Sequence, residues 1–141
     1  MAGIAAGHRG VPHTADLRIE AWAPSRDGCI RQAVLGTVDS FLDISSARPH
    51  RSLSRRLTAG SDDDLLVAVL EEVIFLLDTV GEAPVDLDVQ GGGGVVAEVN
   101  FAMVDARTLP QVGAVPKAVT LNDLRFSHDD NGWRCLVTLD V

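Results

Sequence analysis

The segment Gly60–Pro84, GSDDDLLVAVLEEVIFLLDTVGEAP, carries the strongest structural pattern in the chain. Ser61 is a favoured helix N-cap residue, and the three aspartates after it fall in a first turn, where the helix dipole favours negative charge. Apolar residues then occupy most positions from 65 to 77, and Gly81 ends the run. The pattern predicts a helix that other elements must cover on most of its sides.

The aspartate triplet Asp62–Asp64 has two interpretations. It can supply carboxylates to a metal ion, or it can stabilise the start of the helix. Consecutive helical residues point about 100° apart. The three carboxylates therefore do not converge, and capping is the better explanation.

A second helix is predicted upstream, within Ala23–Ile44. Ser25 can serve as its N-cap. Apolar residues then recur at helical spacing and form one stripe. The stripe consists of Ile30, Ala33, Val34, Val38, Phe41 and Leu42.

Most of the remaining segments alternate between apolar and polar residues, which is typical of strands. The glycine run at 91–94 and the sequence HDDNG at 128–132 mark turns, so two hairpins are predicted. The glycine run lacks the Lys-Ser/Thr pair and the helix that follow a phosphate-binding loop. The predicted strands are Pro12–Trp22, a short strand near Ser54–Thr58, Val85–Val89, Val95–Val104, Pro116–Ser127 and Gly132–Val141.

This order of elements predicts an α+β fold, in which two helices pack on one face of a mostly antiparallel sheet. The length of 141 residues and the hydrophobic content of 46% are typical of a single domain with a sizeable core. We expect residues 1–11 to form a flexible N-terminal segment and residues 12–141 to form the domain.

The composition limits the cellular setting and the partners. A net charge of −8 makes the chain a poor direct ligand for nucleic acid, so any RNA would be held by a basic partner. No apolar run approaches the roughly 20 residues that span a bilayer, and the start lacks a signal-peptide pattern. Cys29 and Cys135 fit two buried thiols in a reducing cytosol, and with the scattered histidines they lack zinc-site spacing. We expect a cytoplasmic protein without a membrane partner.

A basic cluster lies between the two predicted helices, where four arginines fall within nine positions around His50. It can form a contact surface for an acidic or phosphate group, or it can be a solvated edge strand protected by charge. The second interpretation is favoured. The arginines are Arg48, Arg51, Arg55 and Arg56.

Both ends of the predicted domain carry an aspartate in a strand, where this residue type is depleted. Asp16 and Asp140 both project away from the more apolar face of their strands. If these strands are neighbours, the two carboxylates and the α-carboxylate of Val141 can converge, and a hard divalent cation such as Ca²⁺, Mg²⁺ or Mn²⁺ would relieve their repulsion. The alternative is two ordinary solvated acids.

Four segments together resemble the archease family. HTADLRIEAWAPS is similar to the family's opening motif, and DDLLVAVLEEVIFLLDT is similar to its long helix. PKAVTLNDLRF resembles its Lys-Ala-Val-Thr segment, and GWRCLVTLDV resembles its closing strand. The matches occur in the family's order and cover nearly all of 13–141.

The resemblance implies an α+β fold with a strand-helix-strand-strand module. It also implies a non-catalytic activator of a GTP- and Mn²⁺-dependent RNA ligase in tRNA splicing or RNA repair, promoting guanylylation and multiple turnover of that ligase. In the family a metal is held by residues that match Asp16, Asp140 and Val141. The functional lysine matches Lys117, and His13 is a possible supporting or partner-contact residue, or a histidine bonded only to backbone.

The sequence departs from the family pattern at three places. Pro12 replaces a common Glu, Arg18 replaces a Gly, and Leu121-Asn122 replaces an aromatic-His pair. These departures concern contacts with the partner more than the metal residues.

The sequence also allows two other functions, to different degrees. A metal- or small-molecule-binding module unrelated to RNA ligation is the main alternative. A hydrolase with an Asp-His pair is disfavoured, because no Ser or Cys lies in a nucleophile turn such as G-x-S-x-G.

Overall fold

The computed structural model describes residues 4–12, 16–91 and 96–141. Within these ranges the chain forms strands, two α-helices and one 3₁₀ turn. In chain order they are β1 (Gly7–Pro12), β2 (Asp16–Ala23), α1 (Arg26–Asp39), β3 (Arg51–Thr58), α2 (Asp62–Val80), β4 (Glu82–Gly91), β5 (Val96–Asp105), the 3₁₀ turn η1 (Ala106–Thr108), β6 (Ala118–Asp129) and β7 (Gly132–Asp140).

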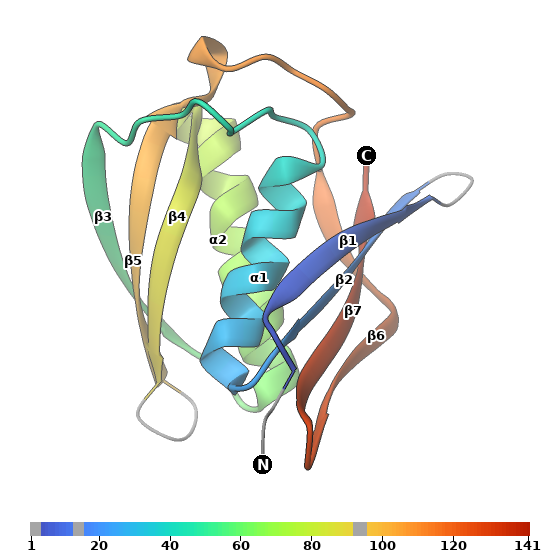
Figure 1. Cartoon of the computed structure of the whole chain (residues 1–141). Coiled ribbons are helices and arrows are strands. Elements are labelled where there is room, and N and C mark those ends of the chain that lie inside the picture. The colour runs from blue at the N-terminus through green and yellow to red at the C-terminus, as the bar shows by residue number, and fades with distance from the viewer. Residues whose placement is uncertain (1–3, 13–15, 92–95) are drawn as a thin grey trace.

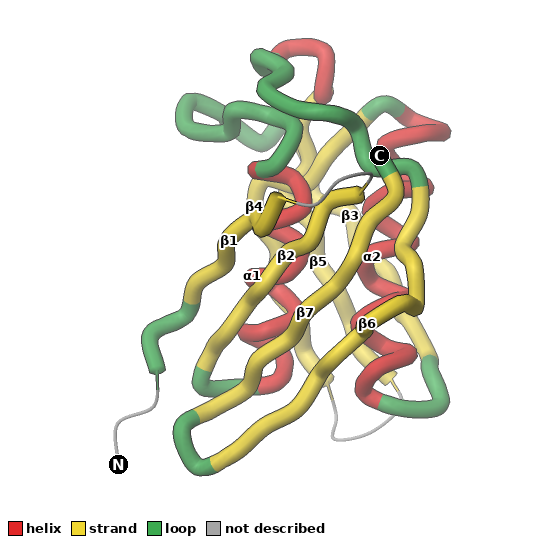
Figure 2. Tube along the Cα trace, turned by 90° about the vertical axis from the view of Figure 1, so that its right-hand side faces the viewer, coloured by secondary structure: helices red, strands yellow, loops and turns green. Residues whose placement is uncertain are grey.

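The strands form two antiparallel sheets, and both helices lie between them (Figure 1). One sheet has the order β1-β2-β7-β6 and the other has the order β3-β5-β4. Helix α1 contacts β2 and β4, and helix α2 contacts β4 and β6, so each helix touches both sheets. Figure 2 shows the four-stranded sheet in front of the helices.

Helix α2 has the ends that its sequence predicts. The Ser61 side chain accepts a hydrogen bond from the Asp64 backbone N–H, and the three aspartates occupy the first turn. Gly81 closes the helix in the left-handed conformation (φ 74°), and its N–H donates to the carbonyls of Leu76 and Leu77. Six of its apolar side chains are buried between the sheets, as the all-round apolar pattern predicted.

Helix α1 also follows its prediction. The Ser25 side chain caps it by accepting from the Gly28 N–H at 3.0 Å. The whole predicted apolar stripe is buried, but the helix ends at Asp39, so Phe41 and Leu42 reach the core from the segment after it.

Strand β1 was not expected from the sequence, which favoured a flexible segment over residues 1–11. It pairs with β2, and Gly7 lies opposite Trp22. Side chains of β1 also reach the neighbouring elements: the His8 Nδ1 lies 2.8 Å from the Gln32 Oε1 on α1, and the Arg9 Nε donates to Glu20 at 2.5 Å. Regular structure in the described ranges therefore begins at Gly7.

Both predicted hairpins are present. Strands β4 and β5 pair around residues 92–95, which lie outside the described ranges and include most of the glycine run. Strands β6 and β7 pair around the turn at 129–132, with a register shift between Thr120 and Arg125. Strand β3 is longer than predicted and begins at Arg51, on the outer edge of its sheet.

The α+β class is therefore confirmed, with a more specific arrangement than one sheet covered on one face. The predicted strand-helix-strand-strand module corresponds to β3-α2-β4-β5. Cys29 and Cys135 are buried free thiols facing one another between α1 and β7. No helix in the described ranges is long and apolar enough to cross a membrane.

Candidate functional site at the acidic end of strands β2 and β7

Strands β2 and β7 are neighbours in the centre of the four-stranded sheet, and their register places Asp16 directly opposite Asp140. The pairs next along the ladder toward the core, Leu17 with Leu139 and Ile19 with Val137, face the helices. Because side chains alternate across a strand, the two aspartates share the opposite, outer face of the sheet.

Directly opposed residues of antiparallel strands have their Cβ atoms about 4.5–5.5 Å apart. Asp140 is exposed, and Asp16 is partly buried. Two carboxylates at this separation repel one another, and a shared cation relieves the repulsion. The register therefore meets the first condition of the predicted acidic site, that the two strands are neighbours.

Lys117 lies at the same end of the sheet, directly before the first residue of β6. Its backbone N–H donates to the Asp140 carbonyl at 2.7 Å, and the next residue, Ala118, pairs with Asp140 in the ladder. Val141 follows Asp140 directly and is partly buried. Lys117, Val141 and Asp16 thus each adjoin Asp140.

The donor set at this end consists of hard oxygen atoms, which suit Ca²⁺, Mg²⁺ or Mn²⁺. Within the described residues, no group of three or more His, Cys, Asp and Glu side chains is arranged to hold a metal ion. Asp16, Asp140 and Val141 are the positions at this end that the resemblance assigns to a metal. His13 lies outside the described residues.

Two of the departures from the family pattern lie together beside the acidic end. The Arg18 side chain crosses the outer face of the sheet and pairs with Asp123 at 2.7 Å. Asp123 has a φ of 59° and lies in the register shift of β6, directly after Leu121-Asn122. The replacement at position 18 and the changed segment of β6 are therefore physically coupled through one ion pair.

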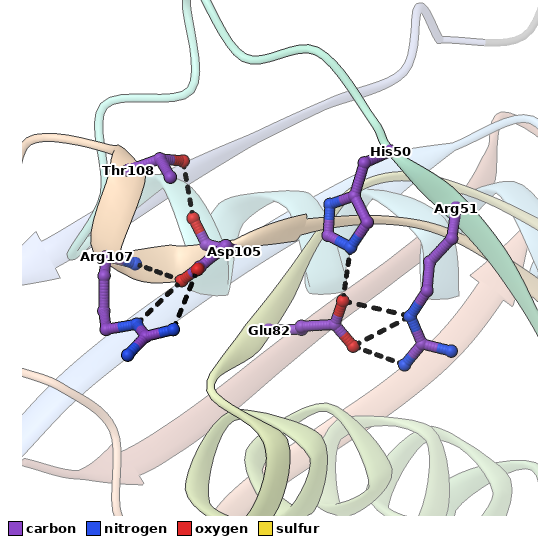
Figure 3. Close-up of polar contacts among 6 residues, drawn as sticks. All are labelled: His50, Arg51, Glu82, Asp105, Arg107 and Thr108. Atoms are coloured by element: carbon purple, nitrogen blue, oxygen red, sulfur yellow. Dashed lines mark hydrogen bonds and ion pairs between the residues drawn. The ribbon is translucent and has the colours of Figure 1, made fainter.

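The basic cluster before and in β3 lies elsewhere and is compensated. The Arg51 guanidinium donates three hydrogen bonds to the Glu82 carboxylate, and the His50 Nε2 lies 2.7 Å from it (Figure 3). These contacts, the Arg51 hydrogen bond first, hold the pKa of the Glu82 carboxyl below its usual value. Alongside, Arg107 pairs with Asp105 at 3.0 Å.

The other two arginines of β3 also pair with carboxylates. Arg55 lies 3.4 Å from Glu72 on α2, and Arg56 lies 3.6 Å from Glu98 on β5. Strand β3 is an edge strand. These ion pairs favour the interpretation of a charged edge over that of a phosphate-binding surface.

A groove of about 640 Å³ between α2 and residues 115–119 was not recognised in the sequence. Its helix wall comes from Glu71, Ile74, Phe75 and Asp78. These positions follow an i, i+3, i+4, i+7 spacing, which places them on one helix face. That spacing was the available signal, but it merged with the apolar run of the whole helix.

The chain is thus a two-sheet α+β domain in which two aspartates lie opposite one another at the end of a central strand pair. It belongs to the Archease protein family, whose model matches residues 8–141. The resemblance inferred from the four sequence segments is confirmed.

Individual relatives agree with this assignment. The chain is 71% identical over 142 residues to a Mycobacterium tuberculosis protein named probable protein archease, covering 99% of this chain and 77% of that protein. It is 26% identical over 135 residues to the Archaeoglobus fulgidus protein archease, covering 95% and 98% of the two chains.

Two solved structures share the fold. The solution structure of Methanobacterium thermoautotrophicum protein 1598 matches with a TM-score of 0.76 and 18% identity, covering 96% of this chain and 99% of that one. The crystal structure of a Thermotoga maritima archease, described as a possible chaperone, matches with a TM-score of 0.65 and 17% identity, covering 93% and 94%.

Proposed function

We propose that this chain is a non-catalytic accessory protein that activates a GTP- and Mn²⁺-dependent RNA ligase in tRNA splicing or RNA repair, promoting guanylylation and multiple turnover of that ligase. The observation that supports this proposal is the direct opposition of Asp16 and Asp140 in the β2–β7 ladder. Like charges placed directly opposite one another across two strands repel, and a shared divalent cation would relieve that repulsion.

The residues that would hold the cation are Asp16, Asp140 and the α-carboxylate of Val141. When bound, a divalent ion supplies positive charge that stabilises phosphoryl oxygens. The chain's own contribution is to hold these oxygen atoms on a rigid sheet end, where β7 is fixed between β2 and β6. Rigid positioning of this kind lowers the entropic cost of aligning a nucleotide for attack.

Lys117 is proposed as the cationic residue beside this end. The hydrogen bond from the Lys117 backbone N–H to the Asp140 carbonyl holds the Lys117 backbone beside Asp140. A lysine ammonium can contact a phosphate as a point charge. With a net charge of −8, the chain would meet RNA only through the ligase. We place this activity in the cytoplasm, where buried free thiols such as Cys29 and Cys135 stay reduced.

The test is guanylylation of the RNA ligase from the same organism, measured with GTP and Mn²⁺ in the presence and absence of the chain. We expect the chain to raise the rate and the number of turnovers. Asp140→Asn should abolish this stimulation, because the neutral amide of Asn binds a hard divalent cation much more weakly than a carboxylate does.

Asp130→Asn is the matched control. It makes the same chemical change on an exposed aspartate in the turn before β7, at the opposite end of that strand. It should stimulate like the parent chain. Equal stimulation by Asp140→Asn and the parent would refute the role of the acidic end, and no stimulation by the parent would refute the proposed function.

A further inference from the structure

The groove between α2 and residues 115–119 exposes apolar side chains on a surface that the fold itself leaves uncovered. Phe75 is 56% exposed on the helix wall, and Val115 is 40% exposed on the opposite wall. Single exposed apolar residues are common on protein surfaces. Here two face a shared hollow, with the partly buried Ile74, Leu77 and Val119 around them.

The helix wall of the groove is acidic. Glu71 and Asp78 flank Phe75 one helical turn to either side, and both are exposed. Phe75 therefore lies between two carboxylates on one helix face. A complementary segment would carry an apolar side chain for the groove and Lys or Arg residues for its acidic rim.

The groove adjoins the acidic end of the sheet. Lys117 and Ala118 line it, and the same two residues contact Asp140 through the Lys117 N–H and the β6–β7 ladder. A partner that fills the groove would thus be held beside Asp140. The two surfaces adjoin at Lys117 and Ala118.

We infer that this groove docks a basic segment of the RNA ligase, with an apolar side chain of that segment against Phe75 and its cationic residues against Glu71 and Asp78. This inference rests on the proposed function. An RNA-binding enzyme must carry basic segments to hold phosphates, whereas this chain is acidic. The groove supplies affinity, and the acidic end supplies stimulation.

The experiment titrates the chain into a guanylylation reaction of the ligase and reports two quantities: the chain concentration for half-maximal stimulation, and the maximal stimulation. Phe75→Ser should raise the half-maximal concentration roughly tenfold, because a buried aromatic contact is lost from the complex. Maximal stimulation should stay unchanged, since Asp16 and Asp140 are intact. Val112→Ser is the matched control, because Val112 is 61% exposed and does not line the groove.

A second variant tests the charges without touching apolar packing. Glu71→Lys should raise the half-maximal concentration more than Asp130→Lys, which makes the same change of charge in the turn between β6 and β7. The half-maximal concentration of the parent should also rise with salt.

Three outcomes are informative. A raised half-maximal concentration for both groove variants, with both controls unchanged, supports the docking site. Unchanged values for Phe75→Ser and Glu71→Lys, with a stimulating parent, overturn the docking site and leave the proposed function standing. A parent chain that neither binds nor stimulates the ligase overturns both.

Discussion

The acidic end of β2 and β7 and the cluster around Glu82 are both rich in charge, but they are built in opposite ways. Around Glu82 the carboxylate lies between the Arg51 guanidinium and the His50 ring and is only 7% exposed. At the acidic end, the ladder places the carboxylates of Asp16 and Asp140 opposite one another.

We expect the Glu82 cluster to stabilise the fold and the aspartate pair to serve the proposed function. Glu82 is the first residue of β4, and its partners His50 and Arg51 lie just before and at the start of β3, far away in the sequence. The charge of Glu82 is therefore balanced within the fold. The aspartate pair joins two strands that main-chain bonds already hold together. The following predictions test this distinction.

The largest effect is expected for metal binding. Asp140→Asn should lower the affinity for Mn²⁺ or Ca²⁺ by about 100-fold or more, since loss of a supporting group alone costs 10–100-fold. Isothermal titration calorimetry measures this. Glu82→Gln should leave the affinity unchanged, and equal losses in the two variants would erase the distinction.

A smaller loss is expected when two residues, Gly-Ser, are added after Val141. The extension moves the α-carboxylate away while leaving Asp16 and Asp140 in place. The metal affinity should fall roughly tenfold, by analogy with the loss of one outer contact. Unchanged affinity would remove the carboxylate of Val141 from the proposed ligand set.

The next prediction concerns stability. Glu82→Gln should lower the melting temperature at pH 7 by roughly 3–6 °C, because the Arg51 guanidinium loses its charged partner in a largely buried position. Thermal melting followed by circular dichroism measures this. A variant that melts with the parent would show that the cluster is not structural.

The pH dependence of that difference has a defined sign. The pKa of Glu82 is lowered in the folded state, chiefly by the hydrogen bonds from Arg51. The stabilisation is therefore fully present above the ordinary glutamate pKa of about 4.3, and is lost as the pH falls through the lower folded value. Melting curves of the parent and of Glu82→Gln should converge below that range, and a constant difference would contradict the assignment.

The smallest effect is expected for Asp140→Asn without added metal. Removing one of two opposed like charges should stabilise the fold by a few tenths of a kcal/mol, about 0.2–1 kcal/mol. Urea unfolding with chelator present measures this. With saturating metal the order should reverse, because only the parent gains the binding free energy.

Local patterns predicted much of this fold. Helix α2 was predicted with its caps, because Ser61 and Gly81 act on adjacent backbone groups. Strand β1 was missed, because GHRGVP lacks alternation and forms a strand through pairing with β2 and the contact of His8 with Gln32. The division into two sheets was also missed, since alternation shows that a strand has an inner face but not which strands it joins.

The candidate site was predictable only in part. Alternation placed Asp16 and Asp140 on the outer faces of their strands, but their direct opposition depends on a register set across the whole sheet. The groove near Phe75 joins α2 to a segment about 40 positions later in the chain, so it follows from tertiary packing. The ion pairs of Arg51, Arg55 and Arg56 likewise involve partners distant in sequence.

Because β7 lies between β2 and β6, Asp16 and Asp140 become opposed only when this strand has paired in the correct register. Strand β7 pairs with β2 on one side and with β6 on the other. A slip of a single residue would turn Asp140 inward and push Leu139 into water. A chain in which β7 has not paired with β2 therefore lacks the opposed Asp16 and Asp140 on which the proposed site depends.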